Sequence, residues 1–177
     1  GVEEPATTIN GTLKAATTAV TDKTTAGLTV VDTTGTTGKK QYAAVSLGDI
    51  TVGSAASGAQ GNTSFTLTNQ AENAVEASSL TVVKNSTTAN TFALNAGKFS
   101  VGKLTNQGNV TLKAGEFSLT GEGSNASDAT ITLADTATAS LVIAEGASLQ
   151  NQGDITGTDN TKGKIKVSGT LTNLPKI

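Results

Sequence analysis

The sequence predicts an all-β fold, and three observations carry that prediction. Short runs of alternating apolar and polar residues recur along the chain, as in Ser64-Phe-Thr-Leu-Thr68 and Thr130-Ile-Thr-Leu133. β-branched residues fill these runs, and Gly, Asn or Asp separates them, which is typical of strands joined by turns. No stretch combines helical spacing of apolar residues with strong helix formers, and the best candidate, residues 70–79, is long enough for only one or two turns.

The expected strands fall into two regions of different composition. Residues 1–58 form an arm rich in Thr, Ala and Gly with two candidate strands, and residues 59–177 form a body of closely spaced strands. Glycine-containing breaks at 33–38 and 53–58 interrupt the arm. In chain order, the candidate strands are residues 12–16, 28–32, 64–68, 79–83, 91–94, 98–101, 109–112, 116–119, 130–133, 140–143, 164–167 and 170–172.

The alternation also predicts which side chains face the core. Within each run, the large apolar residues lie two positions apart and therefore point to the same face of a sheet. The predicted core residues are Phe65, Leu67, Leu80, Val82, Phe92, Leu94, Phe99, Val101, Val110, Leu112, Phe117, Leu119, Ile131, Leu133, Leu141, Ile143, Ile165 and Val167. Because only 3% of the residues are aromatic, this core is expected to be thin.

Internal repeats indicate how the strands are arranged. The segment Leu94-Asn-Ala-Gly-Lys-Phe-Ser-Val101 returns 18 residues later as Leu112-Lys-Ala-Gly-Glu-Phe-Ser-Leu119, and Leu104-Thr-Asn-Gln-Gly108 returns as Leu149-Gln-Asn-Gln-Gly153. Periods of about 20 residues with short strands are typical of stacked coils. We therefore expect a right-handed β-solenoid first, and a two-sheet β-sandwich or jelly roll as the alternative.

Three asparagines recur at corresponding places in these repeats. Asn106 and Asn151 lie 45 residues apart, and Asn173 follows 22 residues later, which corresponds to two coils and then one. At matching turns, their side-chain amides would form an Asn ladder along the stack. The alternative for each position is an ordinary turn residue that tolerates a left-handed backbone.

The repeats resemble those of a known class of surface proteins. The segments LTNQGNVTL, ASLQNQGDITG and KVSGTLTN, within residues 60–177, are similar to the degenerate repeats of secreted β-solenoids, namely autotransporter passengers and filamentous-haemagglutinin-type proteins. The resemblance implies an extracellular or cell-surface β protein, often an adhesin or a fibre. It transfers no functional residue, because these families have no fixed catalytic set.

The composition argues against an enzyme. The chain has no His, Cys, Met, Trp or Arg, so it lacks the usual groups for proton transfer, thiolate attack and phosphate clamping. Asp128 and Asp135, or Asp154 and Asp159, are the nearest approach to a catalytic carboxylate pair, but no aromatic platform accompanies them. The acidic turn at 154–160 matches no calcium-loop pattern. We therefore expect neither a cofactor nor a metal.

Charge and hydropathy limit the partners. The net charge is −2, with a pI near 5.1, which offers no basic face for nucleic acid, and no apolar run is long enough for a membrane-spanning helix. The chain opens without a Met or a charged and apolar leader, so Gly1 is expected to follow a processing event or to be left over from an expression fusion. The candidate N-glycosylation sites, each an Asn-X-Ser/Thr triplet, begin at Asn10, Asn62, Asn85, Asn109 and Asn125.

These observations predict an extracellular structural subunit that assembles with copies of itself into a surface fibre, sheath or layer. Strand pairing between subunits is the expected mechanism, and residues 6–32 of the arm are the expected donor, through Leu13, Val20, Leu28 and Val30. An ordinary edge strand within the same chain is the alternative for this arm. The alternative functions are an adhesin that binds host or environmental glycans, and a virion decoration or tail-fibre protein.

Overall fold

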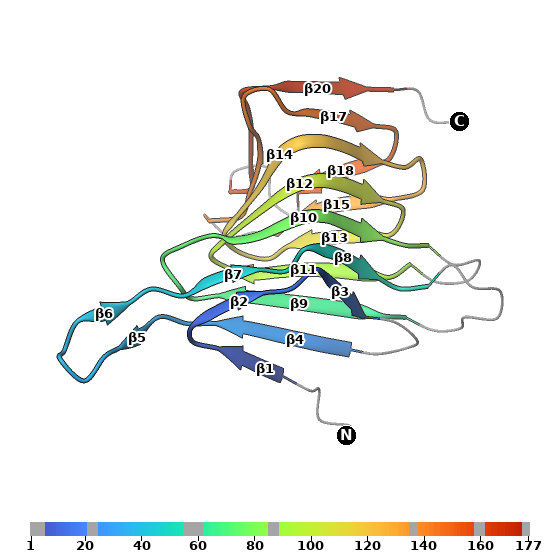
Figure 1. Ribbon diagram of the computed structural model, residues 1–177. Helices are drawn as coiled ribbons and strands as arrows, with labels where there is room; N and C mark the ends of the chain where they lie inside the picture. Colours follow the sequence, from blue (N-terminus) through green and yellow to red (C-terminus); the bar gives the residue numbers. More distant parts are fainter. Residues whose placement is uncertain are drawn as a thin grey trace.

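A computed structural model describes residues 6–20, 25–54, 62–84, 89–134, 138–157 and 162–174, and it confirms the all-β prediction. Every regular element in these ranges is a strand (Figure 1). Within the described residues, no helix is long and apolar enough to cross a membrane. The helical candidate at 70–79 is wrong, since its second half lies in strand β10 (Val75–Val82), where Val75 and Ala77 turn inward in strand alternation.

Two large sheets contain all but two of the strands. The seven-stranded sheet has the order β1 (Ala6–Ile9), β4 (Thr25–Val30), β9 (Ser64–Asn69), β11 (Thr91–Ala96), β13 (Asn109–Leu112), β15 (Thr130–Leu133) and β18 (Asp154–Gly157). The eleven-stranded sheet contains β2 (Thr12–Lys14), β3 (Thr17–Val20), β7 (Ala44–Ser46), β8 (Asp49–Val52), β10, β12 (Lys98–Asn106), β14 (Glu116–Asn125), β16 (Ser140–Ile143), β17 (Ser148–Asn151), β19 (Lys164–Val167) and β20 (Thr170–Asn173). A small antiparallel hairpin of β5 (Thr33–Thr34) and β6 (Lys40–Gln41) completes the described strands.

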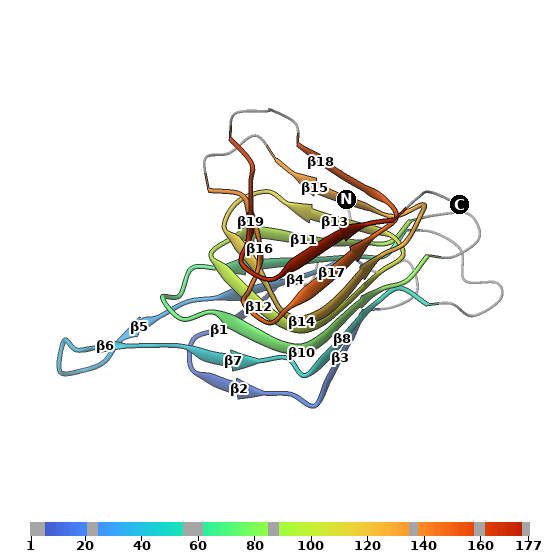
Figure 2. The same cartoon turned by 90° about the horizontal axis from the view of Figure 1, so that it is seen from above.

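The chain alternates between the two large sheets and stacks upward from its N-terminus to its C-terminus (Figure 1). Every strand pair within these sheets is parallel. We call one strand of the seven-stranded sheet, with the strand or strands of the eleven-stranded sheet that follow it, a rung. The first rung is β1–β2–β3 and the last is β18–β19–β20. Seen from above, the rungs enclose a common interior (Figure 2).

Register aligns like residues in columns that run along the stack. Phe65 pairs with Phe92, and Leu67, Leu94, Leu112 and Leu133 pair in succession. Since parallel neighbours lie about 4.8 Å apart, each inward side chain packs on the same kind of side chain in the next rung. The residues between them point outward, so the outer face of the seven-stranded sheet carries mainly Thr and Ser. A register slip of one residue would exchange the two faces, so the alternation itself fixes the register.

All four phenylalanines meet in one cluster at the centre of the stack. Phe92 lies 5.9 Å from Phe65, 5.2 Å from Phe99 and 6.3 Å from Phe117, measured between ring centroids. Phe99 and Phe117 lie 5.4 Å apart with tilted rings. Phe92, Phe99 and Phe117 are completely buried. The few aromatic residues are therefore concentrated in adjacent rungs and join the two sheets across the core.

Two of the predicted core residues lie on the surface. Ile165 and Val167 on β19 are 45% and 47% exposed, whereas the other predicted core residues are buried. The residues of β19 pair with β16 on one side, and no described strand covers the other side. The alternation of β19 is that of a core strand, so the exposure results from its position at the end of the stack.

Glycine at the corner between β13 and β14 permits close approach of two rungs. Gly115 has a φ of 94°, which side-chain-bearing residues rarely adopt. A Cβ atom at this position would also collide with the backbone of Gly97, the corresponding corner one rung below. The repeated Ala-Gly of the sequence therefore marks a corner at which successive rungs contact one another through their backbones.

Truncation of a central phenylalanine is expected to destabilise the whole stack. Phe99→Ala or Phe117→Ala should lower the free energy of unfolding by about 3–5 kcal/mol, because each removes a buried ring and leaves a cavity. Urea denaturation followed by circular dichroism measures this loss. Tyr42→Ala is the control, since Tyr42 is 53% exposed, and its effect should be much smaller. An unchanged midpoint for both Phe variants would contradict the role of the cluster.

Candidate functional site

Asparagine side chains at the ends of successive strands of the eleven-stranded sheet form a row of hydrogen-bonded amides along the stack. The Nδ2 atom of Asn106 donates to Oδ1 of Asn125 at 2.7 Å, Nδ2 of Asn125 donates to Oδ1 of Asn151 at 2.7 Å, and Nδ2 of Asn151 donates to Oδ1 of Asn173 at 3.0 Å. We call these four residues the Asn ladder. The structure thus brings Asn106, Asn151 and Asn173 into one column, with Asn125 between the first two.

Register and strand ends explain the ladder. Asn106 pairs with Asn125, Asn125 with Asn151, and Asn151 with Asn173, and each is the last residue of its strand. The same column continues toward the N-terminus as Val82, Val52 and Val20, so its first half is apolar and its second half is amide. Along this single column, valine side chains in contact give way at Asn106 to asparagine side chains joined by hydrogen bonds.

Additional backbone acceptors satisfy the buried amides. Nδ2 of Asn106 also donates to the carbonyl oxygen of Thr130 at 3.1 Å, and Nδ2 of Asn125 donates to that of Asp154 at 3.2 Å. At the start of the ladder, Oδ1 of Asn106 accepts a hydrogen bond from the backbone N–H of Gly108. Asn173 is exposed, and its Nδ2 has no partner among the described residues. The ladder therefore ends in a free donor.

The candidate glycosylation sites differ in accessibility. Asn10 and Asn62 are exposed, and Asn109 is partly exposed on the outer face of β13. Asn125 is 1% exposed, and its amide nitrogen donates two hydrogen bonds, so a glycan there is incompatible with this fold. Asn85 lies outside the described residues.

The residues expected to pair with a neighbouring subunit lie in strands that pair with other strands of the same chain. β1 pairs with β4, β3 with β8, and β4 with β9, so the described strands before residue 58 belong to the same two sheets as the body. Val20, Leu28 and Val30 are buried and Leu13 is half-buried, all against the main core. The alternative from the sequence, an edge strand within the same chain, describes β1 and β3, whereas β4 is an inner strand between β1 and β9.

At each end of the stack, one edge of the last described strands has no described partner. In the first rung, β1, β2 and β3 each pair with a described strand on one side only, and so do β18, β19 and β20 in the last rung. Backbone N–H and C=O groups on such edges can pair with another strand. In the last rung, Ile165 and Val167 are exposed and Leu171 is half-buried, although their counterparts in the preceding rung are buried.

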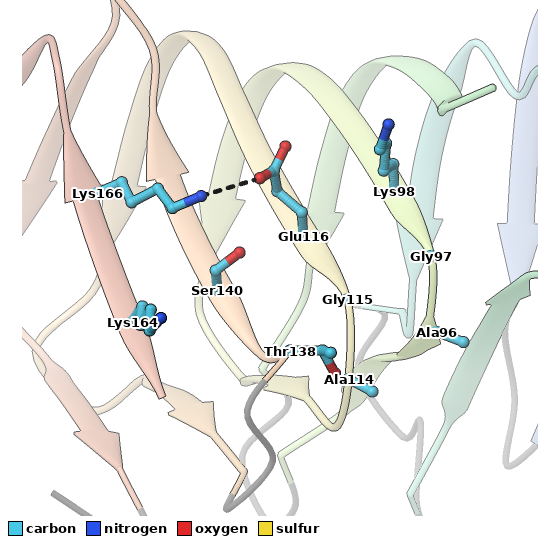
Figure 3. Close-up of a pocket in the computed structure, with 10 residues that line it drawn as sticks. All are labelled: Ala96, Gly97, Lys98, Ala114, Gly115, Glu116, Thr138, Ser140, Lys164 and Lys166. Atoms are coloured by element: carbon cyan, nitrogen blue, oxygen red, sulfur yellow. Dashed lines mark hydrogen bonds and ion pairs between the residues drawn. The ribbon is translucent and has the colours of Figure 1, made fainter. Parts of the chain in front are cut away.

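A groove of about 570 Å³ lies on the outer face of the eleven-stranded sheet (Figure 3). Its lining comprises Ala96, Gly97, Lys98, Ala114, Gly115, Glu116, Thr138, Ser140, Lys164 and Lys166. Glu116 lies between Lys98 and Lys166, and its Oε2 is 3.5 Å from Nζ of Lys166. Within the described part of the chain, Lys98 and Lys164 form no ion pair, so the groove has an excess of positive charge.

A polar cluster holds the base of the β5–β6 hairpin against the stack. Oδ1 of Asp32 accepts a hydrogen bond from the N–H of Ala43 at 2.8 Å, and Oδ2 accepts one from the N–H of Glu72 at 3.0 Å. Nζ of Lys40 lies 3.3 Å from Asp32 and 3.0 Å from Glu72. The Ala43 hydrogen bond is the main reason that the pKa of Asp32 is lowered, and the Glu72 N–H and Lys40 act in the same direction.

The remaining carboxylates form no catalytic arrangement among the described residues. Asp128 forms an ion pair with Lys84 at 3.0 Å, and Asp154 is exposed on β18. Asp135 and Asp159 lie outside the described residues. The described residues contain no group of three or more His, Cys, Asp or Glu residues placed to hold a metal ion.

Removal of an asparagine from the middle of the ladder should destabilise the fold more than removal of an asparagine outside it. Asn125→Ala eliminates two amide-to-amide bonds and leaves a buried acceptor on Asn151 unpaired, with a loss of at least about 1–3 kcal/mol. Asn109→Ala, on the outer face of the neighbouring strand, is the control and should change the stability little. Urea unfolding of both variants provides the comparison. Equal effects would show that the ladder contributes nothing specific.

Acidification should release the Asp32 cluster. A carboxyl group whose pKa is lowered on folding stabilises the fold above its ordinary pKa, near 3.8, and this contribution is lost as the pH falls toward its lower folded pKa. The amide signals of Ala43 and Glu72 should therefore titrate together, with a midpoint below pH 3.8, in an NMR pH series. The same titration should be absent from Asp32→Asn. A midpoint above pH 3.8 would contradict the cluster.

Comparison with known proteins does not assign the chain to a family. No protein-family model matches the chain, and no curated protein or solved structure matches it either. The candidate features for function are therefore those of the molecule itself: the Asn ladder, the two free edges and the lysine-rich groove.

Proposed function

We propose that this chain is an extracellular structural subunit, built as a right-handed β-solenoid, that assembles with copies of itself into a surface fibre, sheath or layer. The alternation of parallel strands between two sheets supports the solenoid, and parallel crossover connections are almost always right-handed. In this proposal the subunit is not an enzyme, and strand pairing between subunits is the mechanism of assembly.

The single observation that carries the proposal is the uncovered last rung. Ile165 and Val167 lie in register with the buried Leu141 and Ile143 of β16, yet each is about half exposed. Monomeric β proteins protect such edges with edge lysines, proline, bulges or inward charges, and of these β19 carries Lys164 and Lys166 at its outward positions. Neither proline of the sequence, at 5 or 175, lies in a described strand, and the inward positions of β19 carry no charge. Cover by another strand would remove this apolar surface from water.

The composition supports an extracellular or cell-surface location. A chain without Cys, Met, Trp or His has few side chains that oxidants attack, which suits a long-lived polymer outside the cell. The abundant small residues allow the closely packed columns of the stack without large aromatic groups.

The lysine-rich groove favours a second candidate function, binding of an anionic glycan by a surface adhesin. Lys98, Lys164 and Lys166 face a single carboxylate, Glu116, in the groove. Uronate or sulfate groups would complement the excess charge. The threonine and serine hydroxyls that also line it can donate hydrogen bonds to sugar oxygens. A virion decoration or tail-fibre role is also compatible with the stack, but no single contact favours it.

Sedimentation and electron microscopy over a range of concentrations test the structural proposal. The protein should form elongated particles whose mass increases with concentration, and oriented particles should diffract at about 4.8 Å along their axis, since the strands would lie across it. A single monomeric species at every concentration would refute self-assembly. In that case, binding of polygalacturonate that is lost in a Lys98→Gln/Lys164→Gln double variant would support the adhesin.

A further inference from the structure

We propose that the last rung of one copy docks onto the first rung of a second copy, head to tail and in the register that continues the columns of the stack. This inference rests on the proposed self-assembly and specifies its contact: the edge of β18–β19–β20 against the edge of β1–β2–β3. The contact is heterologous, because the two surfaces differ, so repetition generates an open filament rather than a closed dimer.

The first argument is that the two edges have the same layout. Both rungs consist of one strand of the seven-stranded sheet followed by two short strands of the eleven-stranded sheet. The paired registers between successive strands place Thr172 in the same column as Ala19, and Asn173 in the same column as Val20. If the second copy is placed one rung spacing beyond the last rung, its β3 therefore lies beside β20, with Ala19 next to Thr172 and Val20 next to Asn173.

The second argument is that the columns meet with compatible side chains. Ile165 shares its column with Leu13, so the docked copy would cover an exposed isoleucine with a half-buried leucine. Leu171 shares its column with Thr18, whose methyl group would lie over it. Burial of these apolar groups is the expected driving force for association.

The third argument comes from the free end of the Asn ladder. Asn106 and Asn125 each donate to a backbone carbonyl at the start of a β strand, Thr130 or Asp154. Thr25 is the equivalent residue in the second rung. It pairs with Ser64, Ser64 with Thr91, Thr91 with Asn109, and Asn109 with Thr130, so these residues form one column along the seven-stranded sheet. The Thr25 carbonyl of the second copy would therefore accept one hydrogen bond from the free Nδ2 of Asn173.

One position in this contact is imperfect, and it makes the register testable. The next ladder position in the second copy is Val20, which cannot accept the remaining N–H of Asn173. Val20→Asn would supply the missing acceptor and extend the ladder across the junction. It should lower the dissociation constant about 2- to 10-fold, the value of one added hydrogen bond. A weaker association of this variant, with the monomer still folded, would contradict the head-to-tail register.

Charge on the outer face should act against the contact. Lys166 lies in the same column as Lys14, so docking would place two exposed ammonium groups side by side. Added salt screens such repulsion. Association is therefore expected to strengthen between low and physiological ionic strength, and Lys14→Glu should strengthen it at low salt. The opposite salt dependence would exclude this placement of the two lysines.

Engineered cysteines provide the decisive measurement, because the chain has none of its own. One preparation carries Ala19→Cys and the other Thr172→Cys, and both residues are exposed. In the proposed contact their Cα atoms would lie about 4.8 Å apart, within the range of a disulfide. Oxidation of the mixture should give a covalent dimer, and oxidation of either preparation alone should not. Thr17→Cys, two residues out of register, is the matched control and should not cross-link to Thr172→Cys.

Substitution of the exposed isoleucine separates this inference from self-assembly in general. Ile165→Lys should weaken association at least about 10-fold, because it places a charge in the docked surface. Thr111→Lys, which adds the same charge on the outer face of the central strand β13, should have little effect. Particles that form normally with Ile165→Lys, and without the cysteine cross-link, would overturn the head-to-tail contact but leave self-assembly intact. A monomer under all conditions would overturn both.

Discussion

The parallel register between successive rungs is the constraint on which the rest of this structure depends. Each inward side chain packs on its counterpart above and below, so the core is a set of columns, and the phenylalanine cluster forms where aromatic columns of the two sheets meet. A chain with 3% aromatic residues can form a folded interior in this way, because each column needs only a side chain of similar size in every rung. The corners follow from the same constraint, since rungs that lie about 4.8 Å apart leave no room for a side chain between Gly97 and Gly115.

The Asn ladder shows how a polar column is accommodated in such a core. A buried amide without partners is destabilising, but an amide above and below another amide finds both a donor and an acceptor. The change from Val82 to Asn106 in one column is tolerated because Gly108 supplies the first donor. At the end of the ladder, the amide oxygen of Asn173 accepts a hydrogen bond from Asn151, but its Nδ2 has no partner among the described residues. The repeated amide-to-amide hydrogen bonding that satisfies the buried asparagines therefore leaves one N–H donor, on Asn173, without a described acceptor at the end of the row.

Much of the body was predictable from the sequence, because its repeats are local. The 18-residue return of the phenylalanine segment indicated stacked coils, and in the structure the two copies lie in register, with Phe99 paired to Phe117. Asn125 was missed as a ladder member because it lacks the Asn-Gln-Gly context, although the 45-residue gap between Asn106 and Asn151 spans two rungs and leaves a place between them. The sequence offered pairing of the arm within its own chain only as an alternative, because the β5–β6 hairpin lengthens the second rung and obscures its period. The exposure of Ile165 depends on position in the stack, which alternation does not encode.

The central location of the phenylalanine cluster has a consequence for cooperativity. Each rung contacts only its neighbours, so the stack resembles a one-dimensional lattice in which an inner unit has two interfaces and a terminal unit has one. All four rings lie in β9, β11, β12 and β14, and none lies in the first or last rung. Local opening therefore begins at the two ends and becomes progressively less favourable toward the aromatic centre. Whatever covers a terminal rung converts it into an inner unit, and it thereby suppresses fraying across the neighbouring rungs as well as burying its own contact area.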